Sequence, residues 1–218
     1  MDRKKSGHRS RMISNFISTP SNFSNLDIIK LLLFIAIPRK DITHLATSLY
    51  SSCTSLNDLF TNINLLPVTD NVKMICMLCI EITNRLNYEN IHNKPITTNY
   101  NDLITYLRVL LSERIQEELL VIFQNNKGNI IKIQTICVGT LNQVQIYPRE
   151  IFRKCFEYGS NQIILVHNHP TKDPTPSSMD IQMTKHMKQA SSFLDISIED
   201  HIIIGGNHYF SFKQNNLL

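Results

Sequence analysis

The residues best able to do chemistry lie in the stretch HNHPTKDPTPSSMD, from His167 to Asp180. His167 and His169 are two positions apart, so in an extended segment their side chains leave the backbone on the same side. Two imidazoles and one carboxylate form a three-ligand set that holds zinc and leaves a fourth position for water. Asp180 follows His169 by eleven residues and can supply the carboxylate. The stretch therefore predicts a metal site.

The same stretch also has a purely structural interpretation. Ser177 and Asp180 have the spacing of a capping box, in which a serine begins a helix and an acid three residues later reaches back to it. The prolines at 170, 174 and 176 restrict the loop before this helix start. A capped helix does not explain two histidines that flank Asn168 at the end of an apolar run, so we favour the metal site.

The elements around this stretch alternate between strands and helices. The run QIILV at 162–166 indicates a strand that is buried on both faces and leads directly into the histidines. Further strands are predicted at 117–123, 129–138, 196–204 and 209–212. Helices are predicted at 103–111, 148–158 and 178–193. This order predicts an α+β fold around one sheet.

The first part of the chain has a different pattern and predicts a separate unit. Residues 21–88 contain four or five helical segments, the first of which begins after a Ser/Asn/Asp cluster suited to N-capping. The polar, asparagine-rich segment 89–101 carries no hydrophobic periodicity and predicts a linker. We expect a basic arm over 1–20, a small helical domain over 21–88, and the α+β domain over 102–218.

Composition limits the class of protein. Hydrophobic residues make up 42% and charged residues 18% of the 218 positions, which is typical of a globular protein rather than a disordered one. No apolar run reaches the roughly 18 residues that a membrane span needs, and the N-terminus lacks the apolar core of a secretory signal. We therefore expect a cytoplasmic protein with no membrane partner.

The five cysteines are scattered and do not predict a disulfide framework. Cys76 and Cys79 form a C-x-x-C motif, which in other settings binds zinc or does redox chemistry. Here they lie in an apolar helical run with no second ligand pair nearby. We favour buried free thiols.

The net charge of +4 is concentrated at the N-terminus. Residues 1–12 carry five basic side chains and one acidic side chain, and the remaining 17 basic and 17 acidic residues cancel. Such an arm can make a weak contact with nucleic acid through its phosphates. A solvated terminus without a partner is the alternative, and both interpretations stay open.

The spacing H-x-H, seven residues, S, two residues, D in HNHPTKDPTPSSMD resembles the JAMM signature of the MPN/JAB metallopeptidases. The chain also resembles the RadC branch of that superfamily through GTLNQV, PRE, DHIII and HYFSF in its second half, and through GHRSRM and LLLFIAIPRKD in its first half. The resemblance implies an MPN/JAB domain with a mixed β-sheet flanked by helices. It also implies one Zn²⁺ per chain, held by His167, His169 and Asp180.

The resemblance implies two further roles. Ser177 would stabilise the oxyanion of the tetrahedral intermediate, and a glutamate before the first strand would act as general base. From the residues alone, the base must be a carboxylate on a neighbouring strand, and Glu117 and Glu118 both qualify by type. Successive residues of a strand face opposite sides, so only one can serve. The family's pattern favours Glu117, with Glu118 as the alternative. Nothing indicates a binding site for an organic cofactor.

We therefore expect a zinc-dependent, metallopeptidase-like hydrolase that cleaves a peptide or isopeptide bond in a peptide or protein substrate. Two alternatives stay open: a DNA-associated protein, linked to repair or recombination, that uses the JAMM fold as a scaffold, and a catalytically silent interaction module. Asp200 and His201 match a further family position, as a contact to the metal ligands or as a hydrogen-bonded core pair.

The helical domain departs from the family. Relatives carry a glycine hairpin there that resembles DNA-binding helix–hairpin–helix modules, whose backbone amides approach phosphate. The matching stretch PVTDNVK at 67–73 contains no glycine and carries Asp70. We expect a degenerate helix–hairpin–helix-like domain that binds phosphate poorly.

Overall fold

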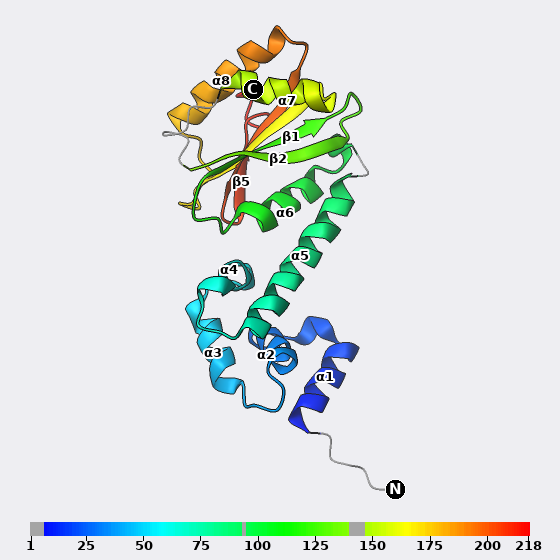
Figure 1. Ribbon diagram of the computed structural model, residues 1–218, viewed down its shortest axis with the longest axis vertical. Helices are drawn as coiled ribbons and strands as arrows, with labels where there is room; N and C mark the ends of the chain where they lie inside the picture. The colour runs from blue at the N-terminus through cyan, green and yellow to red at the C-terminus, as the bar shows by residue number, and fades with distance from the viewer. Residues whose placement is uncertain (1–6, 93–94, 140–146) are drawn as a thin grey trace. The chain divides into compact units, whose positions relative to one another are not determined.

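The computed structural model describes residues 7–92, 95–139 and 147–218 (Figure 1). The chain divides into two units, Met1–Thr83 and Asn84–Leu218. The boundary falls inside one long helix, α5 (Asp70–His92). Among the described residues, no helix combines the length and the apolar character that a membrane crossing requires.

The first unit consists of helices that surround one hydrophobic core (Figure 1). In chain order they are α1 (His8–Ser18), the short 3-10 helix η1 (Pro20–Asn22), α2 (Asn25–Ala36), α3 (Thr43–Ser52), α4 (Leu56–Thr61), the 3-10 helix η2 (Ile63–Leu65) and the first part of α5. Ser24 begins α2 with a capping box that includes Asp27, and Ser55 caps α4. Leu33 and Val72, neither of which is exposed to solvent, lie in the core.

The segment predicted as a basic arm is helical where the structure describes it. Helix α1 covers most of the predicted arm 1–20, and residues 1–6 lie outside the described residues. The Arg9 guanidinium donates hydrogen bonds to the backbone carbonyls of Ile37 and Lys40 and lies 4.6 Å from the centre of the Phe34 ring. These tertiary contacts order the segment and engage Arg9, which composition alone could not indicate.

The second unit is built on a five-stranded sheet in the order β2–β1–β3–β4–β5. The strands are β1 (Glu118–Gln124), β2 (Ile130–Val138), β3 (Gln162–Asn168), β4 (Ser197–Gly205) and β5 (His208–Ser211). β1 pairs antiparallel with β2 and β3, β3 pairs parallel with β4, and β4 pairs antiparallel with β5. The predicted α+β fold with a mixed sheet is confirmed.

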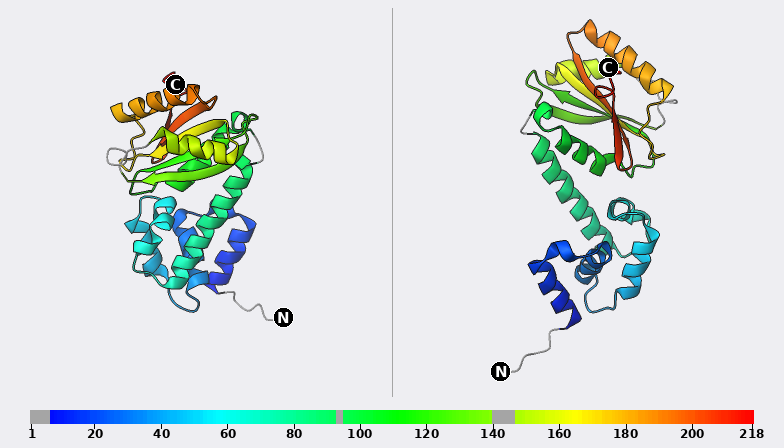
Figure 2. Two further views of the ribbon diagram at one scale, coloured as in Figure 1. Left: turned by 45° about the horizontal axis from the view of Figure 1, so that its top comes forward. Right: turned by 180° about the vertical axis from the view of Figure 1, so that it is seen from behind.

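Helices cover both faces of this sheet (Figures 1 and 2). They are η3 (Ile96–Thr98), α6 (Tyr100–Leu111), α7 (Pro148–Tyr158) and α8 (Ser178–Ser192). Helix α6 packs on one face against Ile164 and Val166 of β3, whereas α7 and α8 pack on the other face against Leu165. The alternation of side chains along β3 therefore places His167 on the face covered by α7 and α8.

Where the structure describes it, the segment predicted as a linker, 89–101, is mostly helical and belongs to the second unit. Helix α5 continues to His92, η3 follows, and α6 begins at Tyr100. Ile91 and Ile96 are 1% and 4% exposed and lie in the core on the α6 face of the sheet. Two isolated isoleucines create no periodicity, so the pattern could not reveal that they anchor this segment.

Candidate metal centre

The three predicted metal ligands converge at the end of β3 and the start of α8. His167 Nε2 lies 3.0 Å from His169 Nε2 and 3.2 Å from Asp180 Oδ1. His169 Nε2 lies 3.5 Å from Asp180 Oδ2. His167 and Asp180 are buried, while the His169 side chain is 13% exposed and gives the group its contact with solvent. The group is thus enclosed by protein but open on one side.

Hydrogen bonds fix which nitrogen of His169 carries a hydrogen. His169 Nδ1 lies 2.8 Å from the backbone carbonyl oxygen of Asp173. A carbonyl oxygen can only accept, so Nδ1 must donate and Nε2 keeps a lone pair in the neutral ring. Asp173 therefore contributes through its backbone. Its carboxylate accepts from the backbone and hydroxyl of Thr175 and holds the proline loop.

Three successive hydrogen bonds determine which ring nitrogen of His167 carries a hydrogen. The Thr184 hydroxyl donates to the backbone carbonyl of Asp180 at 2.6 Å, so its oxygen is left to accept from His201 Nδ1 at 2.7 Å. His201 Nε2 then accepts from His167 Nδ1 at 2.8 Å. His167 Nε2, which faces the group, is therefore the nitrogen with the lone pair. This assignment follows from the hydrogen-bond network.

The facing atoms, Nε2 of both histidines and the two oxygens of Asp180, consequently all present lone pairs while the rings are neutral. Such atoms, about 3 Å apart, repel one another unless a cation or a proton lies between them. Burial would lower the pKa of His169, but the contact that its protonated ring makes with Asp180, the Asp173 carbonyl, and the charges of Asp180 and Glu117 raise it. Burial would raise the pKa of Asp180, but its contacts with the imidazoles of His167 and His169 bring it far below its usual range. The group therefore favours the binding of a cation.

Its dimensions suit zinc. A tetrahedral zinc ion with nitrogen and oxygen ligands at about 2.0–2.2 Å places neighbouring ligand atoms roughly 3.3 Å apart. The two imidazole nitrogens are 3.0 Å apart, and they lie 3.2 and 3.5 Å from different oxygens of Asp180. One ligand atom from each of the three residues lies within 4.8 Å of the other two, so His167, His169 and Asp180 could hold a metal ion.

Ser177 and Asp180 also begin α8, so this stretch forms both the predicted capping box and the candidate metal site. Ser177 Oγ accepts from the Asp180 backbone N–H at 3.2 Å, and the Ser177 backbone N–H donates to Asp180 Oδ2 at 2.7 Å. The Ser177 hydroxyl donates to the same oxygen at 2.6 Å. The capping box holds Oδ2 and turns Oδ1 towards His167. The predicted oxyanion role of Ser177 stays a prediction.

The register of β1 against β3 distinguishes the two candidate glutamates. Leu119 pairs with His167 in this antiparallel ladder, so Glu117 falls opposite His169 when the register is continued. Opposed residues share a face, which puts Glu117 on the side of the metal ligands and Glu118 on the other side. Glu118 forms an ion pair with Arg114 at 3.5 Å. The Glu117 charge is instead among those that raise the pKa of His169.

Asn168, between the two histidines, forms hydrogen bonds with the backbone of the segment that carries Glu117. Its side-chain oxygen accepts from the Glu118 backbone N–H at 2.8 Å, and its amide nitrogen donates to the Gln116 carbonyl at 3.0 Å. Because Asn168 points to the opposite face from the histidines, it can hold β1 without entering the metal group. The sequence reasoning gave no role to Asn168 or Thr184. The i, i+4 spacing of Asp180 and Thr184 on one helix could have indicated the second.

Gly205 allows the proline loop to pass close to the end of β4. A Cβ atom at this position would lie 2.5 Å from Pro174 N and 2.7 Å from the Asp173 carbonyl carbon. The His169 backbone N–H donates to the Ile204 carbonyl at 2.8 Å, just before this contact. Because Gly205 has no side chain, the end of β4 can lie close enough to position both His169 and the Asp173 carbonyl that orients it.

Comparisons with known proteins find a family model and relatives that match this chain. A family model described as "RadC-like JAB domain" matches residues 97–217. A "UPF0758 protein" from Pelodictyon phaeoclathratiforme is 40% identical over 151 residues, which are 69% of this chain and 68% of the relative. A "UPF0758 protein" from Chlorobium phaeovibrioides is 39% identical over 138 residues, which are 63% of this chain and 61% of that relative. The matched region contains the whole metal-ligand group.

Proposed function

Because this chain belongs to the family of RadC-like JAB domains, we propose that it is a zinc-dependent, metallopeptidase-like hydrolase of a peptide or isopeptide bond. His167, His169 and Asp180 would hold one zinc ion. The observation that carries the proposal is the convergence of two imidazole nitrogens, whose lone pairs are fixed by hydrogen bonds, with the Asp180 carboxylate at separations of 3.0, 3.2 and 3.5 Å.

Each residue around the ligands has a distinct part in the proposed reaction. When bound, zinc supplies a Lewis acid that polarises a carbonyl and lowers the pKa of a water from 15.7 to about 7. Glu117 takes a proton from the attacking water and returns it to the leaving amine. Asn168 fixes the backbone on either side of Glu117. Ser177 orients Asp180, and its hydroxyl serves the oxyanion if it turns from Asp180 to the substrate.

The first experiment measures metal content. The purified full chain is expected to take up about one zinc ion per chain, since the three ligands form a single group. His169→Ala should lose that zinc, whereas His186→Ala, which alters an exposed position on α8, should retain it. A wild-type protein that stays metal-free after incubation with zinc would overturn the proposal.

The second experiment distinguishes hydrolysis from the two alternative functions. A silent interaction module would bind zinc but cleave no member of a peptide and isopeptide library. A DNA-associated protein would bind DNA with an affinity that falls with salt and disappears on deletion of residues 1–12. The engagement of Arg9 by backbone carbonyls and the acidic Asp70 at the start of α5 count against the DNA-associated alternative.

A further inference from the structure

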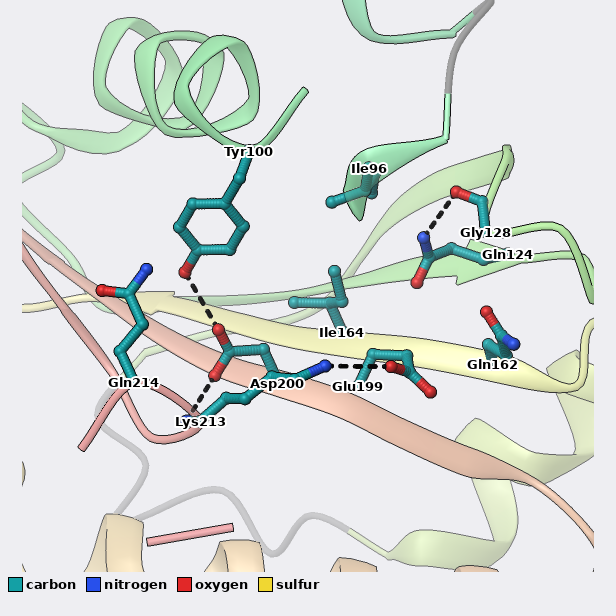
Figure 3. A pocket seen from close by; sticks show the side chains of 10 residues that line it. All are labelled: Ile96, Tyr100, Gln124, Gly128, Gln162, Ile164, Glu199, Asp200, Lys213 and Gln214. Atoms are coloured by element: carbon teal, nitrogen blue, oxygen red, sulfur yellow. Dashed lines mark hydrogen bonds and ion pairs between the residues drawn. The ribbon is translucent and has the colours of Figure 1, made fainter. Parts of the chain in front are cut away.

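A cavity lies in the second unit, lined by residues of η3, α6 and the sheet (Figure 3). Its volume is about 280 Å³, close to the lower end of the range for small-molecule sites. Ile164 contributes to its floor, and His167 follows three positions later on the same strand, so their side chains point to opposite faces. We propose that this cavity binds a small, planar organic cation that donates N–H groups, such as an amidinium or a guanidinium.

One end of the cavity holds a hydrogen-bond acceptor that has no donor in the described part of the chain. Gln124, which is 2% exposed, donates from Nε2 to the Gly128 carbonyl at 2.8 Å. Its Oε1 is buried and has no hydrogen-bond partner among the described residues. Figure 3 shows this oxygen turned towards the space between Ile96 and Ile164. A buried acceptor without a partner is destabilising, so a ligand that donates an N–H there would gain affinity.

The other end of the cavity carries an excess of negative charge. The Asp200 carboxylate accepts from the Tyr100 hydroxyl at 2.9 Å and from the Lys213 backbone N–H at 3.0 Å. Burial and the Asp200 charge raise the pKa of Tyr100, so the phenol stays a neutral donor. At the rim, the Glu199 carboxylate lies 3.2 Å from Lys213 Nζ. Two carboxylates and one ammonium favour a cation over an anion.

The middle of the cavity is apolar. Ile96 and Ile164 lie between the glutamine end and the carboxylate end, where the ring of Tyr100 stands beside Asp200 (Figure 3). Apolar side chains of this kind can pack against the face of a planar group, while its edge donates to Gln124 Oε1. An amidinium or guanidinium combines this face with N–H donors and a positive charge.

The test uses two probes that share a ring and differ in the group attached to it. The isotope-labelled full chain is titrated with benzamidine and, separately, with benzoate, while backbone amide signals are followed by NMR. Benzamidine is expected to shift Gly128, Ile164 and Lys213 in a saturable way, with a dissociation constant of about 1 mM. Benzoate should leave these three signals unchanged. The signals of His167 and Asp180 report separately on binding at the metal centre.

Two variants link the binding to the cavity. Gln124→Met removes the acceptor oxygen and should weaken benzamidine binding about tenfold. Gln189→Met, on the exposed side of α8, should not change it. Lys213→Gln removes the positive charge at the rim from a side chain that is 58% exposed, and should strengthen binding about twofold.

Three results would overturn the assignment. The first is no saturable shift with benzamidine at about 10 mM. The second is equal binding of benzoate at the cavity signals. The third is a Lys213→Gln protein that binds benzamidine more weakly than the wild type. This last result is informative even if Gln124→Met fails to fold, because Lys213 is a surface residue.

Discussion

His201 Nε2 lies 2.8 Å from His167 Nδ1, so a fully buried histidine decides which nitrogen of a candidate zinc ligand is free to bind metal. Burial, together with the nearby His167, lowers the pKa of His201 well below its ordinary value and keeps the ring neutral. The neutral ring accepts a hydrogen bond from His167 and donates one to the Thr184 hydroxyl. The predicted contact of His201 with the metal ligands is therefore a tautomer-selecting contact.

The first prediction concerns the end of this chain of contacts. Thr184→Val keeps the side-chain shape but removes the hydroxyl that orients His201. Zinc affinity should fall by about tenfold, within the 10–100-fold typical of such supporting contacts, although no ligand is changed. Competition with a fluorescent zinc chelator measures it. Thr105→Val is the control, because Thr105 makes a similar bond to the carbonyl four residues earlier on an exposed face of α6.

The second prediction separates the two glutamates. Glu117→Gln should keep its zinc and lower kcat by about 10²–10⁴, because the amide cannot take the proton from water. Glu118→Gln loses only its ion pair with Arg114 and should retain activity, with a stability change of at most about 1 kcal/mol. Steady-state hydrolysis and metal content are measured on both. An active Glu117→Gln protein would contradict the assigned base.

The third prediction tests whether Ser177 does more than begin a helix. Ser177→Ala should destabilise the protein by about 1 kcal/mol through loss of the cap, and an oxyanion role would add a 10²–10³-fold loss in kcat. Ser24→Ala removes the serine of a similar capping box in the first unit. Its unfolding free energy should fall similarly while kcat stays unchanged. Equal kcat values for the two variants would show that Ser177 acts only as a helix cap.

The fourth prediction concerns the loop that orients His169. Gly205→Ala would drive its Cβ into Pro174 and displace the Asp173 carbonyl from His169 Nδ1. We expect a loss of about 1–3 kcal/mol in unfolding free energy and a weaker zinc site. Gly159→Ala is the control: Gly159 has a positive φ of 65° but nothing within 4 Å of its Cβ position. It should lose stability without any change in zinc affinity.

The fifth prediction concerns the C-x-x-C motif. Burial raises the pKa of Cys76 to about 11, and burial also raises that of Cys155 to about 11, whereas Cys79 is exposed. Because the thiolate is the reactive form, Cys79 should react with iodoacetamide at about pH 8 well before the other two. Mass spectrometry of the modified peptides follows the order. Reaction of Cys76 at the same rate as Cys79 in the folded protein would contradict it.

The sequence by itself indicated the candidate ligands and the elements that carry them. His167, His169, Ser177 and Asp180 are close along the chain, so strand alternation and a helix start are enough to bring them together. The apolar run before His167 likewise indicated a buried central strand, because burial on both faces requires apolar residues at every position. Predictions from local patterns of this kind hold in the folded protein, because the strand and the helix that contain them form as expected.

Only the tertiary structure decided what lies around those ligands. The register of β1 against β3, when continued by two residues, puts Glu117 on the face of the candidate ligands, and that register is a property of two strands far apart in sequence. The contact of Thr184 with His201, and the Gln124 oxygen that has no partner among the described residues, likewise arise between distant elements. Sequence patterns report which face a side chain prefers, whereas packing determines which side chain it meets there.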